Sequence, residues 1–305
     1  MKNEIVFFLI FICAFMKAQS LQKVTVGRIE RIEAFESKFI DSRIIDIWLP
    51  ENYSDNKKYA VLYMQDGQML YDAETTWNKQ AWEIEEVLSK LSQENKIKET
   101  IVVGIWNGGK VRHASYFPQK PYENLSKEDK ALVTKKLQEK GRTTEAFVPN
   151  SDNYLKFIVN ELKPFIDKKY SVRTNLENTF IGGSSMGGLI SMYAICEYPE
   201  IFGGAICMST HWPGSFEAVD NPIPDSFLNY LSNNLPNPKN HKIYFDCGDQ
   251  TLDAIYPEIQ KKVDAVMISK KFTSNNWLTK YFIGEDHSEK SWSKRLNYPL
   301  EFILK

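Results

Sequence analysis

Residues 179–191, with the sequence TFIGGSSMGGLIS, constrain the fold of this chain more than any other segment. A β-branched and aromatic run enters a cluster of small residues, and a run compatible with a helix leaves it. Gly183 and Gly187 stand two positions before and after Ser185, and glycines there relieve the crowding of a very tight turn. We therefore expect a strand, a sharp turn that carries Ser185, and a helix whose N-terminus points at that turn.

This turn has the pattern of a catalytic serine. The residues from Gly183 to Gly187 fit G-x-S-x-G with Ser185 at the centre, and the strand–turn–helix context separates that pattern from an ordinary glycine-rich turn. Choosing Ser184 instead would move the glycines out of register. The sequence therefore predicts Ser185 as a nucleophile.

Around the turn, short apolar runs alternate with longer segments of helical periodicity. The expected strands are residues 25–35, 43–50, 59–65, 101–106, 179–183, 203–208, 242–247 and 278–283. The expected helices are residues 77–91, 152–169, 186–197, 253–269 and 288–304. This alternation predicts an α/β fold with a mostly parallel central sheet and helices on both faces.

Residues 108–151 interrupt the alternation. They are polar, with glycine, proline and lysine throughout, and a short helix is expected at 127–139. Long insertions at the carboxyl end of a strand form lids and substrate walls in α/β enzymes. We expect a polar lid-like insertion here; a surface loop without a role explains the composition equally well.

The N-terminus has the pattern of a signal peptide. Lys2 precedes an unbroken apolar run at residues 5–15, which is too short to span a bilayer but fits the apolar region of a signal sequence. We expect residues 1–18 to be removed, which leaves residues 19–305 as the mature domain. An uncleaved anchor is the alternative. Cleavage predicts a periplasmic or secreted protein without stable membrane association.

Charge and cysteine usage exclude several classes of protein. The formal net charge is −1, which gives no sign of a nucleic-acid partner. Beyond Cys13 in the signal segment, Cys196, Cys207 and Cys247 are an odd number and lie in apolar segments. We expect buried thiols rather than disulfides or a metal site.

Chain order selects the general base among four histidines. In a fold of this kind the catalytic residues follow in the order serine, acid, histidine. His113 precedes the serine, and His241 directly precedes a strand, at the wrong end of the sheet. His211 precedes any late acid, so it is expected in the substrate pocket. His287 follows the last expected strand and is predicted as the base.

The acid should follow the strand at residues 242–247. Asp246 lies within that strand, whereas Asp249 and Asp253 follow it. The acid would hold the imidazole in its tautomer and stabilise the imidazolium. Chain order does not separate Asp249 from Asp253.

Acyl transfer also needs backbone N–H donors for the oxyanion. One is expected at Met186, directly after the nucleophile, and the second at Gln68, in the loop after the strand at residues 59–65. Gly67 would let that loop approach the site closely. An ordinary strand-end turn is the alternative for Asp66-Gly67.

Together these segments resemble the esterase D-like family of α/β-hydrolases. That family includes S-formylglutathione hydrolases, feruloyl and acetylxylan esterases, enterobactin-type siderophore esterases and mycolyltransferases. The resemblance rests on residues 61–68 (VLYMQDGQ), 101–112 (IVVGIWNGGKVR), 180–193 (FIGGSSMGGLISMY) and 284–292 (GEDHSEKSW). It covers roughly residues 43–304, so that residues 19–305 are expected to form one α/β-hydrolase domain after the signal peptide. It also supports Ser185, His287 and the Gln68 and Met186 amides in the roles above. The acid-to-histidine interval in S-formylglutathione hydrolases matches Asp253 better than Asp249, so the resemblance implies Asp253 as the acid.

The resemblance also suggests residues that contact the substrate. Family members often carry Arg-x-x-Glu-Tyr before a proline, and the match here is Arg112, Ser115, Tyr116 and Pro118, with serine in place of the acid. The chain therefore lacks the carboxylate that this motif carries in the family. The predicted substrate-binding residues are Arg112, Tyr116, His211 and Trp212.

The sequence as a whole predicts a serine carboxylic-ester hydrolase that works through an acyl-enzyme and needs no metal or organic cofactor. The expected partner is a small-molecule or carbohydrate-linked ester, such as a siderophore ester or an acylated carbohydrate. An acyltransferase to an alcohol acceptor and a non-catalytic ligand-binding protein on the same fold are the alternatives.

Overall fold

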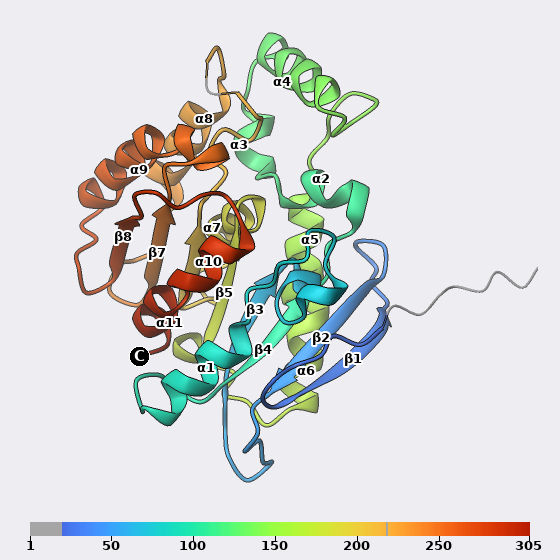
Figure 1. Cartoon of the computed structure of the whole chain (residues 1–305). Coiled ribbons are helices and arrows are strands. Elements are labelled where there is room, and N and C mark those ends of the chain that lie inside the picture. Colours follow the sequence, from blue (N-terminus) through green and yellow to red (C-terminus); the bar gives the residue numbers. More distant parts are fainter. Residues whose placement is uncertain (1–19, 218) are drawn as a thin grey trace, which may run out of the picture.

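The structure is a computed structural model of the 305-residue chain that describes residues 20–217 and 219–305 (Figure 1). The predicted signal peptide at residues 1–18, with Cys13, lies outside the described residues. Within the described part of the chain, no helix is both long and apolar enough to cross a membrane.

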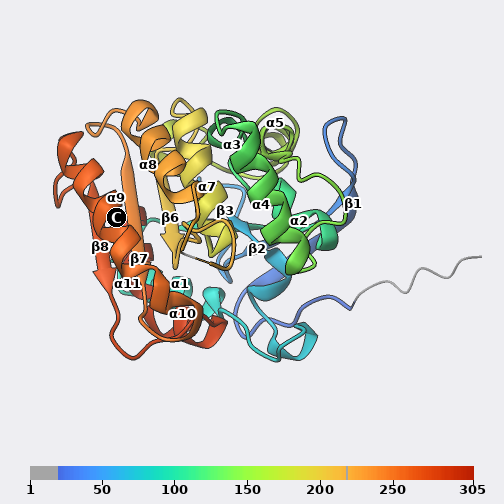
Figure 2. The same ribbon diagram turned by 90° about the horizontal axis from the view of Figure 1, so that it is seen from above.

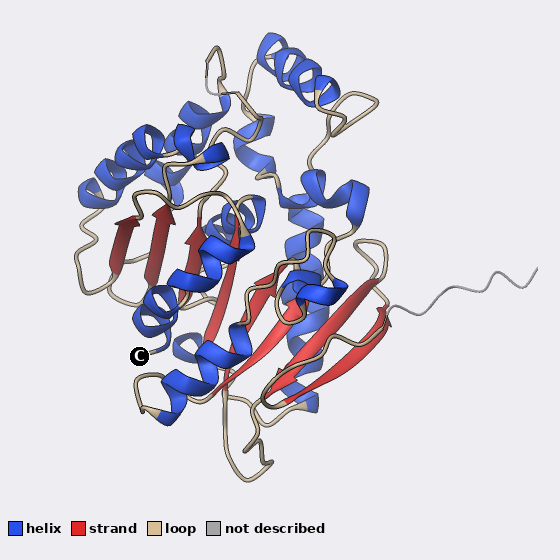
Figure 3. Cartoon of the chain, in the orientation of Figure 1, coloured by secondary structure: helices blue, strands red, loops and turns tan. Residues whose placement is uncertain are grey.

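An eight-stranded sheet runs through the molecule in the order β1-β2-β4-β3-β5-β6-β7-β8 (Figure 3). The strands are β1 (Arg28–Phe35), β2 (Arg43–Leu49), β3 (Ala60–Gln65), β4 (Thr100–Ile105), β5 (Thr179–Ser184), β6 (Gly204–Met208), β7 (Lys242–Cys247) and β8 (Trp277–Tyr281). Only β2 runs against its two neighbours; every pair from β4 to β8 is parallel. All eight predicted strands are confirmed, with ends within three residues of those expected.

Helices cover both faces of this sheet, which explains why its strands are apolar throughout. On β3, Val61 and Tyr63 pack into one core and Leu62 and Met64 into the other. The second core is covered by α1 (Ile84–Gln93), α10 (Glu289–Arg295) and α11 (Asn297–Leu304). The first is covered by α5 (Ser151–Phe157), α6 (Lys163–Lys169), α7 (Met186–Glu197), α8 (Ile223–Asn234) and α9 (Pro257–Ser269) (Figure 2). The predicted α/β fold is confirmed.

Several helix predictions need correction. The helix expected at residues 77–91 begins only at Ile84, because Lys79 and Glu83 adopt positive φ angles of 57° and 53° that a right-handed helix excludes. The helix expected at 253–269 begins at Pro257 and follows a 3-10 turn over Thr251–Ile255. Proline suits the first helical position because the missing N–H would have no partner there.

Three further differences concern two segments that were expected as single helices and one that was not expected to be helical. The helix expected at 152–169 contains a π-helical turn over Ile158–Leu162, just before Pro164, which has no N–H to donate. The segment 288–304 divides at Leu296 into α10 and α11. Helix α8 was not predicted, because prolines and serines interrupt its short apolar pattern.

The insertion at residues 108–151 is a folded lobe. It contains α2 (Arg112–Tyr116), α3 (Gln119–Glu123) and α4 (Lys127–Glu139), and α4 has the bounds that the sequence predicted. Its interior is aromatic: the rings of Phe117, Tyr122 and Phe147 meet edge to face at centroid distances of 5.2–5.7 Å. In Figure 1 the lobe stands above the sheet, with α4 at its outer end.

The cysteines follow the prediction. Cys196, Cys207 and Cys247 are buried and unpaired. Burial raises the pKa of all three thiols, so they are inert core residues.

Candidate active site

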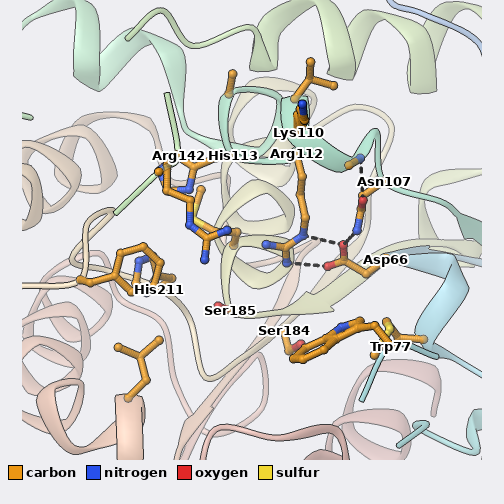
Figure 4. Close-up of a pocket in the computed structure, with 18 of the residues that line it drawn as sticks. Asp66, Trp77, Asn107, Lys110, Arg112, His113, Arg142, Ser184, Ser185 and His211 are labelled. Carbon is orange, nitrogen blue, oxygen red and sulfur yellow. Dashed lines mark hydrogen bonds and ion pairs between the residues drawn. The ribbon is translucent and has the colours of Figure 1, made fainter. Parts of the chain in front are cut away.

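The polar side chains of the candidate site gather where the parallel strands end. Asp66 follows β3, Ser185 follows β5, His211 follows β6, and Asp253 and His287 follow β7 and β8. Carboxyl ends of parallel strands meet at one edge of a sheet, which is where open α/β proteins bind ligands. A pocket of about 1390 Å³ opens there between the sheet edge and the insertion (Figure 4).

Ser185 occupies a strained turn between β5 and α7. Its φ and ψ are 56° and −124°, a conformation that L-residues rarely adopt. Its N–H donates to the Met208 carbonyl at 2.9 Å, and a Cβ on Gly183 would lie 2.9 Å from the Gln65 Cβ and from the carbonyl carbon of Gly187. Only small residues fit around the turn, and the surrounding contacts hold its conformation.

His287 is paired with Asp253. Nδ1 of the His287 ring lies 2.5 Å from Oδ1 of Asp253. The backbone N–H of His287 donates to the Thr251 hydroxyl at 3.0 Å. The ring meets Trp292 edge-on at a centroid distance of 5.0 Å. Because a carboxylate only accepts hydrogen bonds, Nδ1 carries the proton and Nε2 presents its lone pair. His287 and Ser185 line the same pocket.

Asp253 is held by donors on its other oxygen. Oδ2 accepts from the Ser209 hydroxyl at 2.6 Å and from the Gly248 N–H at 2.7 Å, and the Arg295 guanidinium lies 3.8 Å away. The carboxylate is fully buried. These donors compensate for the loss of water around a buried charge.

Asp249, the alternative acid, points elsewhere. Its Oδ1 accepts from the Gly284 N–H at 2.8 Å, which bridges two loops. Hydrogen bonds from Gln250 and Gly284 lower the pKa of this carboxyl. Of the two candidates that chain order left open, the structure pairs Asp253 with His287.

Gln68 and Met186 both line the pocket beside Ser185. Met186 is the first residue of α7, where backbone N–H groups have no partner within the helix. Gln68 lies in a 3-10 turn over Gly67–Met69, and a Cβ on Gly67 would approach the Gly104 carbonyl carbon to 2.5 Å. That close approach requires glycine and brings the Gln68 turn against β4.

Arg112 lies on the pocket wall and is anchored by Asp66. Its Nε and Nη2 donate to the two carboxylate oxygens at 2.6 and 2.7 Å, and Asn107 donates to the same carboxylate at 2.6 Å (Figure 4). Tyr116 lies behind this pair. Its hydroxyl accepts from the Asp66 N–H at 3.3 Å, and the Arg112 guanidinium stacks over its ring.

Of the four predicted substrate-binding residues, Arg112 and His211 line the pocket. Tyr116 and Trp212 are buried outside its lining, and the Trp212 indole donates to Gln260 at 2.8 Å. Both aromatic rings pack in the hydrophobic core, and the sequence does not distinguish a core aromatic residue from one that lines a pocket.

Other residues also line the pocket, and the sequence did not single out His113 or Arg142 among them as site residues. His113 lines the wall of the insertion, and burial lowers its pKa to about 3, so it is neutral. Arg142 reaches the pocket from the end of the insertion and stacks on Phe216. Trp77 is 84% exposed at the rim.

The loop that carries Trp77 is tied to the segment after His287. Asn78 donates to Glu289 at 2.7 Å, and the Lys290 N–H donates to the Gln80 side chain at 3.1 Å. Among residues 20–217 and 219–305, no group of three or more histidine, cysteine, aspartate or glutamate side chains is arranged to hold a metal ion.

The sheet order, with a serine on the turn after β5 and a histidine after the last strand, defines the chain as an α/β-hydrolase. A family model described as "Putative esterase" matches residues 38–303, and the chain belongs to this family. It is therefore a carboxylic ester hydrolase.

Known proteins resemble the chain over most of its length. The uncharacterised protein YbbA of Bacillus subtilis is 25% identical over 271 residues, which are 86% of this chain and 92% of that protein. A CE1 ferulic acid esterase from Anaeromyces mucronatus, solved with ferulic acid, aligns with a TM-score of 0.62 at 19% identity over 95% of this chain and 97% of that one. The enterobactin esterase of Shigella flexneri aligns with a TM-score of 0.65 at 15% identity over 92% of this chain and 60% of that one.

Proposed function

We propose that this chain hydrolyses carboxylic esters through Ser185, His287 and Asp253, by way of an acyl-enzyme. The observation that carries the proposal is the 2.5 Å contact between His287 Nδ1 and Asp253 Oδ1 beside the pocket that Ser185 also lines. A histidine oriented in this way has one nitrogen left to accept a proton, and that nitrogen is the general base.

In the first half-reaction His287 Nε2 takes the Ser185 proton while the hydroxyl oxygen attacks the ester carbonyl. The buried Asp253 stabilises the imidazolium that forms. His287 then returns the proton to the departing alkoxide, and the acyl group stays on Ser185. In the second half-reaction His287 takes a proton from water as the water oxygen attacks the acyl carbonyl. His287 then returns that proton to the Ser185 oxygen as the acid departs.

The oxyanion of each tetrahedral intermediate accepts hydrogen bonds from the backbone N–H groups of Gln68 and Met186. Two features support this assignment: Met186 begins helix α7, and the Gln68 turn lies tightly against β4 at Gly67. Fixed donors near developing charge are commonly the largest contribution to acyl-transfer catalysis. The reaction needs no cofactor.

The pocket supports a substrate larger than a simple acyl ester. Its volume of about 1390 Å³ exceeds the 300–1,000 Å³ typical of small-molecule sites. We propose a siderophore ester or an acylated carbohydrate, with Arg112 and His211 in contact with it and Tyr116 and Trp212 supporting these residues from behind. The similar solved esterases are named for ferulic acid, an aromatic acid that can be the acyl group of an acylated carbohydrate, and for enterobactin, a siderophore.

Export fits such a substrate. We propose that residues 1–18 form a signal peptide, so that residues 19–305 act as an α/β-hydrolase domain in the periplasm or outside the cell. The apolar run at residues 5–15 supports this proposal.

Ser185→Ala tests the catalytic assignment. Removing the nucleophile should lower kcat by about 10³-fold or more on whichever ester the wild type hydrolyses best. Suitable esters are 4-nitrophenyl acetate and butyrate, methyl ferulate, acetylated xylan and enterobactin. Intact-protein mass spectrometry of the quenched reaction should detect an acyl adduct on the wild type and none on the variant.

Ser184→Ala is the matched control, because it changes the neighbouring serine in the same turn. It should keep most of the activity and the acyl adduct. Full hydrolytic activity in Ser185→Ala would remove Ser185 from the mechanism.

A further inference from the structure

The hydroxyl of Tyr256 lies between two residues of the pocket and has no role in the mechanism above. The side chain is fully buried. Its hydroxyl lies 2.6 Å from Nδ1 of His211, and the neighbouring Ser185 hydroxyl can donate a hydrogen bond to it. The Tyr256 ring meets the His287 ring edge-on at a centroid distance of 5.7 Å. One phenol therefore contacts the proposed nucleophile, its base and a second histidine.

One ring nitrogen of His211, a residue that lines the pocket, has no hydrogen-bond partner among the described residues. The side chain is 1% exposed, and Nε2 is buried with no hydrogen bond among the described residues, although His211 lines the pocket. Its backbone N–H donates to the Ser185 carbonyl at 3.2 Å, which keeps the ring close to the nucleophile. A buried polar atom left unpaired is costly, so a ligand in the pocket is the natural partner of Nε2.

Both groups are neutral at physiological pH. Burial, together with the positive charges of Arg112 and Arg142, lowers the pKa of His211 well below its usual range. Burial raises the pKa of Tyr256 well above its usual range. A neutral imidazole carries one proton on either nitrogen, and a phenol both donates and accepts.

The hydrogen-bonded chain from Ser185 through Tyr256 to His211 therefore has two directions. In one, Ser185 donates to Tyr256, Tyr256 donates to Nδ1, and Nε2 of His211 carries the proton. In the other, Nδ1–H donates to Tyr256, Tyr256 donates to the Ser185 oxygen, and Nε2 presents a lone pair. Only the second direction leaves the Ser185 proton free to go to His287.

We propose that Tyr256 and His211 couple recognition of a substrate hydroxyl to activation of Ser185. A substrate O–H that donates to Nε2 selects the second direction and so directs the Ser185 proton toward His287. The preferred substrate class is an ester with a hydroxyl on the α-carbon of its acyl group or on the second carbon of its alcohol. Tyr256 is a positioning residue in this scheme. The inference rests on the proposed ester hydrolysis through Ser185.

Matched pairs of esters test the proposal. The acyl-side pair is 4-nitrophenyl acetate and 4-nitrophenyl glycolate, and the alcohol-side pair is ethyl butyrate and 2-hydroxyethyl butyrate. Each kcat/KM is divided by the rate constant of hydroxide-catalysed hydrolysis of the same ester, which removes intrinsic reactivity. The wild type should favour the hydroxylated member of at least one pair by about tenfold, as expected for one buried hydrogen bond.

Two variants interrupt the hydrogen-bonded series from Ser185 to His211 at different points. Each leaves an aromatic ring at the substituted position. Tyr256→Phe removes the link to Ser185, and His211→Phe removes the nitrogen that meets the substrate. In each, the normalised preference should fall to about one. Tyr59→Phe is the matched control: it removes another buried phenol hydroxyl, bonded at 3.0 Å to the Asn52 carbonyl before β3, and should keep the wild-type preference.

The outcomes separate this inference from the proposed function. Two results would contradict the coupling while the esterase assignment stands, provided that Ser185→Ala abolishes hydrolysis. Either the wild type does not discriminate between the members of either ester pair, or the preference persists in Tyr256→Phe. If Ser185→Ala hydrolyses as the wild type does, the proposed function itself fails. Thermal unfolding of each variant identifies any that does not fold, in which case the other ring-preserving variant decides.

Discussion

Asp253 and Asp249 follow the same strand four residues apart, and their surroundings differ completely. Asp253 is buried against His287, whereas Asp249 bridges two surface loops. Asp253→Asn should lower kcat by about 10³–10⁴-fold, because an amide no longer fixes the histidine tautomer or stabilises the imidazolium. Asp249→Asn, the matched control, should stay within about twofold of the wild type. Steady-state kinetics on the best ester measures both; equal losses would contradict the assignment.

At the residue scale, the sequence predicts what depends on chain order and local geometry. Ser185 is identified by its glycines and by the strand before it, and His287 by its place after the last strand. The choice between Asp249 and Asp253 depends on the 3-10 turn before Pro257, which has no distinctive pattern. Tyr256 was missed because a buried phenol near a helix start resembles any core tyrosine.

A buried side chain of helix α10, Arg295, forms an ion pair with the central sheet. The Arg295 guanidinium lies 3.0 Å from Asp246 on β7 and 2.8 Å from the Ser209 hydroxyl after β6. It is 2% exposed, and Asp246 is fully buried. Arg295→Leu would leave the Asp246 and Asp253 carboxylates without this cation, so it should lower the free energy of unfolding by about 3–5 kcal/mol.

Lys294→Leu is the matched control for that change. Lys294 is on the same helix but pairs with Glu285 at the surface, so its loss should lower the free energy of unfolding by less than about 1 kcal/mol. Urea unfolding followed by circular dichroism compares the two variants. Equal losses of unfolding free energy in the two variants would mean that the buried Arg295 contributes no more to stability than the surface Lys294.

At the element scale, strands were easier to predict than helices. Strands buried on both faces are short apolar runs, and such runs stand out between polar segments. Helix starts depend on backbone features that apolar periodicity does not encode. The positive φ of Glu83 prevents α1 from beginning before Ile84. The π-helical turn before Pro164 interrupts an apolar periodicity that is otherwise continuous. The strand order was not predicted either, since it depends on pairings between distant segments.

For the molecule as a whole, Glu85 on α1 should make stability depend on pH. It is 1% exposed, and burial raises its pKa to about 7. The folded chain therefore binds this proton more tightly than the unfolded chain, whose pKa is near 4.5. The stabilising contribution is complete below about pH 4.5 and is lost as the pH rises through 7.

Glu85→Gln mimics the protonated side chain at every pH. It should raise the free energy of unfolding by up to about 3 kcal/mol at pH 8 and by clearly less at pH 5. Glu86→Gln, at the exposed neighbouring position, should change little at either pH. Urea unfolding of each variant at pH 5 and pH 8 measures these changes in the free energy of unfolding. A Glu85→Gln effect that is the same at both pH values would contradict a raised pKa of Glu85 in the folded chain.

The exposed indole of Trp77, tethered to the segment after His287 through Asn78 and Gln80, makes an optical probe of the pocket. Acrylamide should quench its fluorescence, and a bound ligand should shield it; Trp77→Phe should abolish the quenched component. Because emission does not require turnover, Ser185→Ala would report the affinity for an intact ester directly.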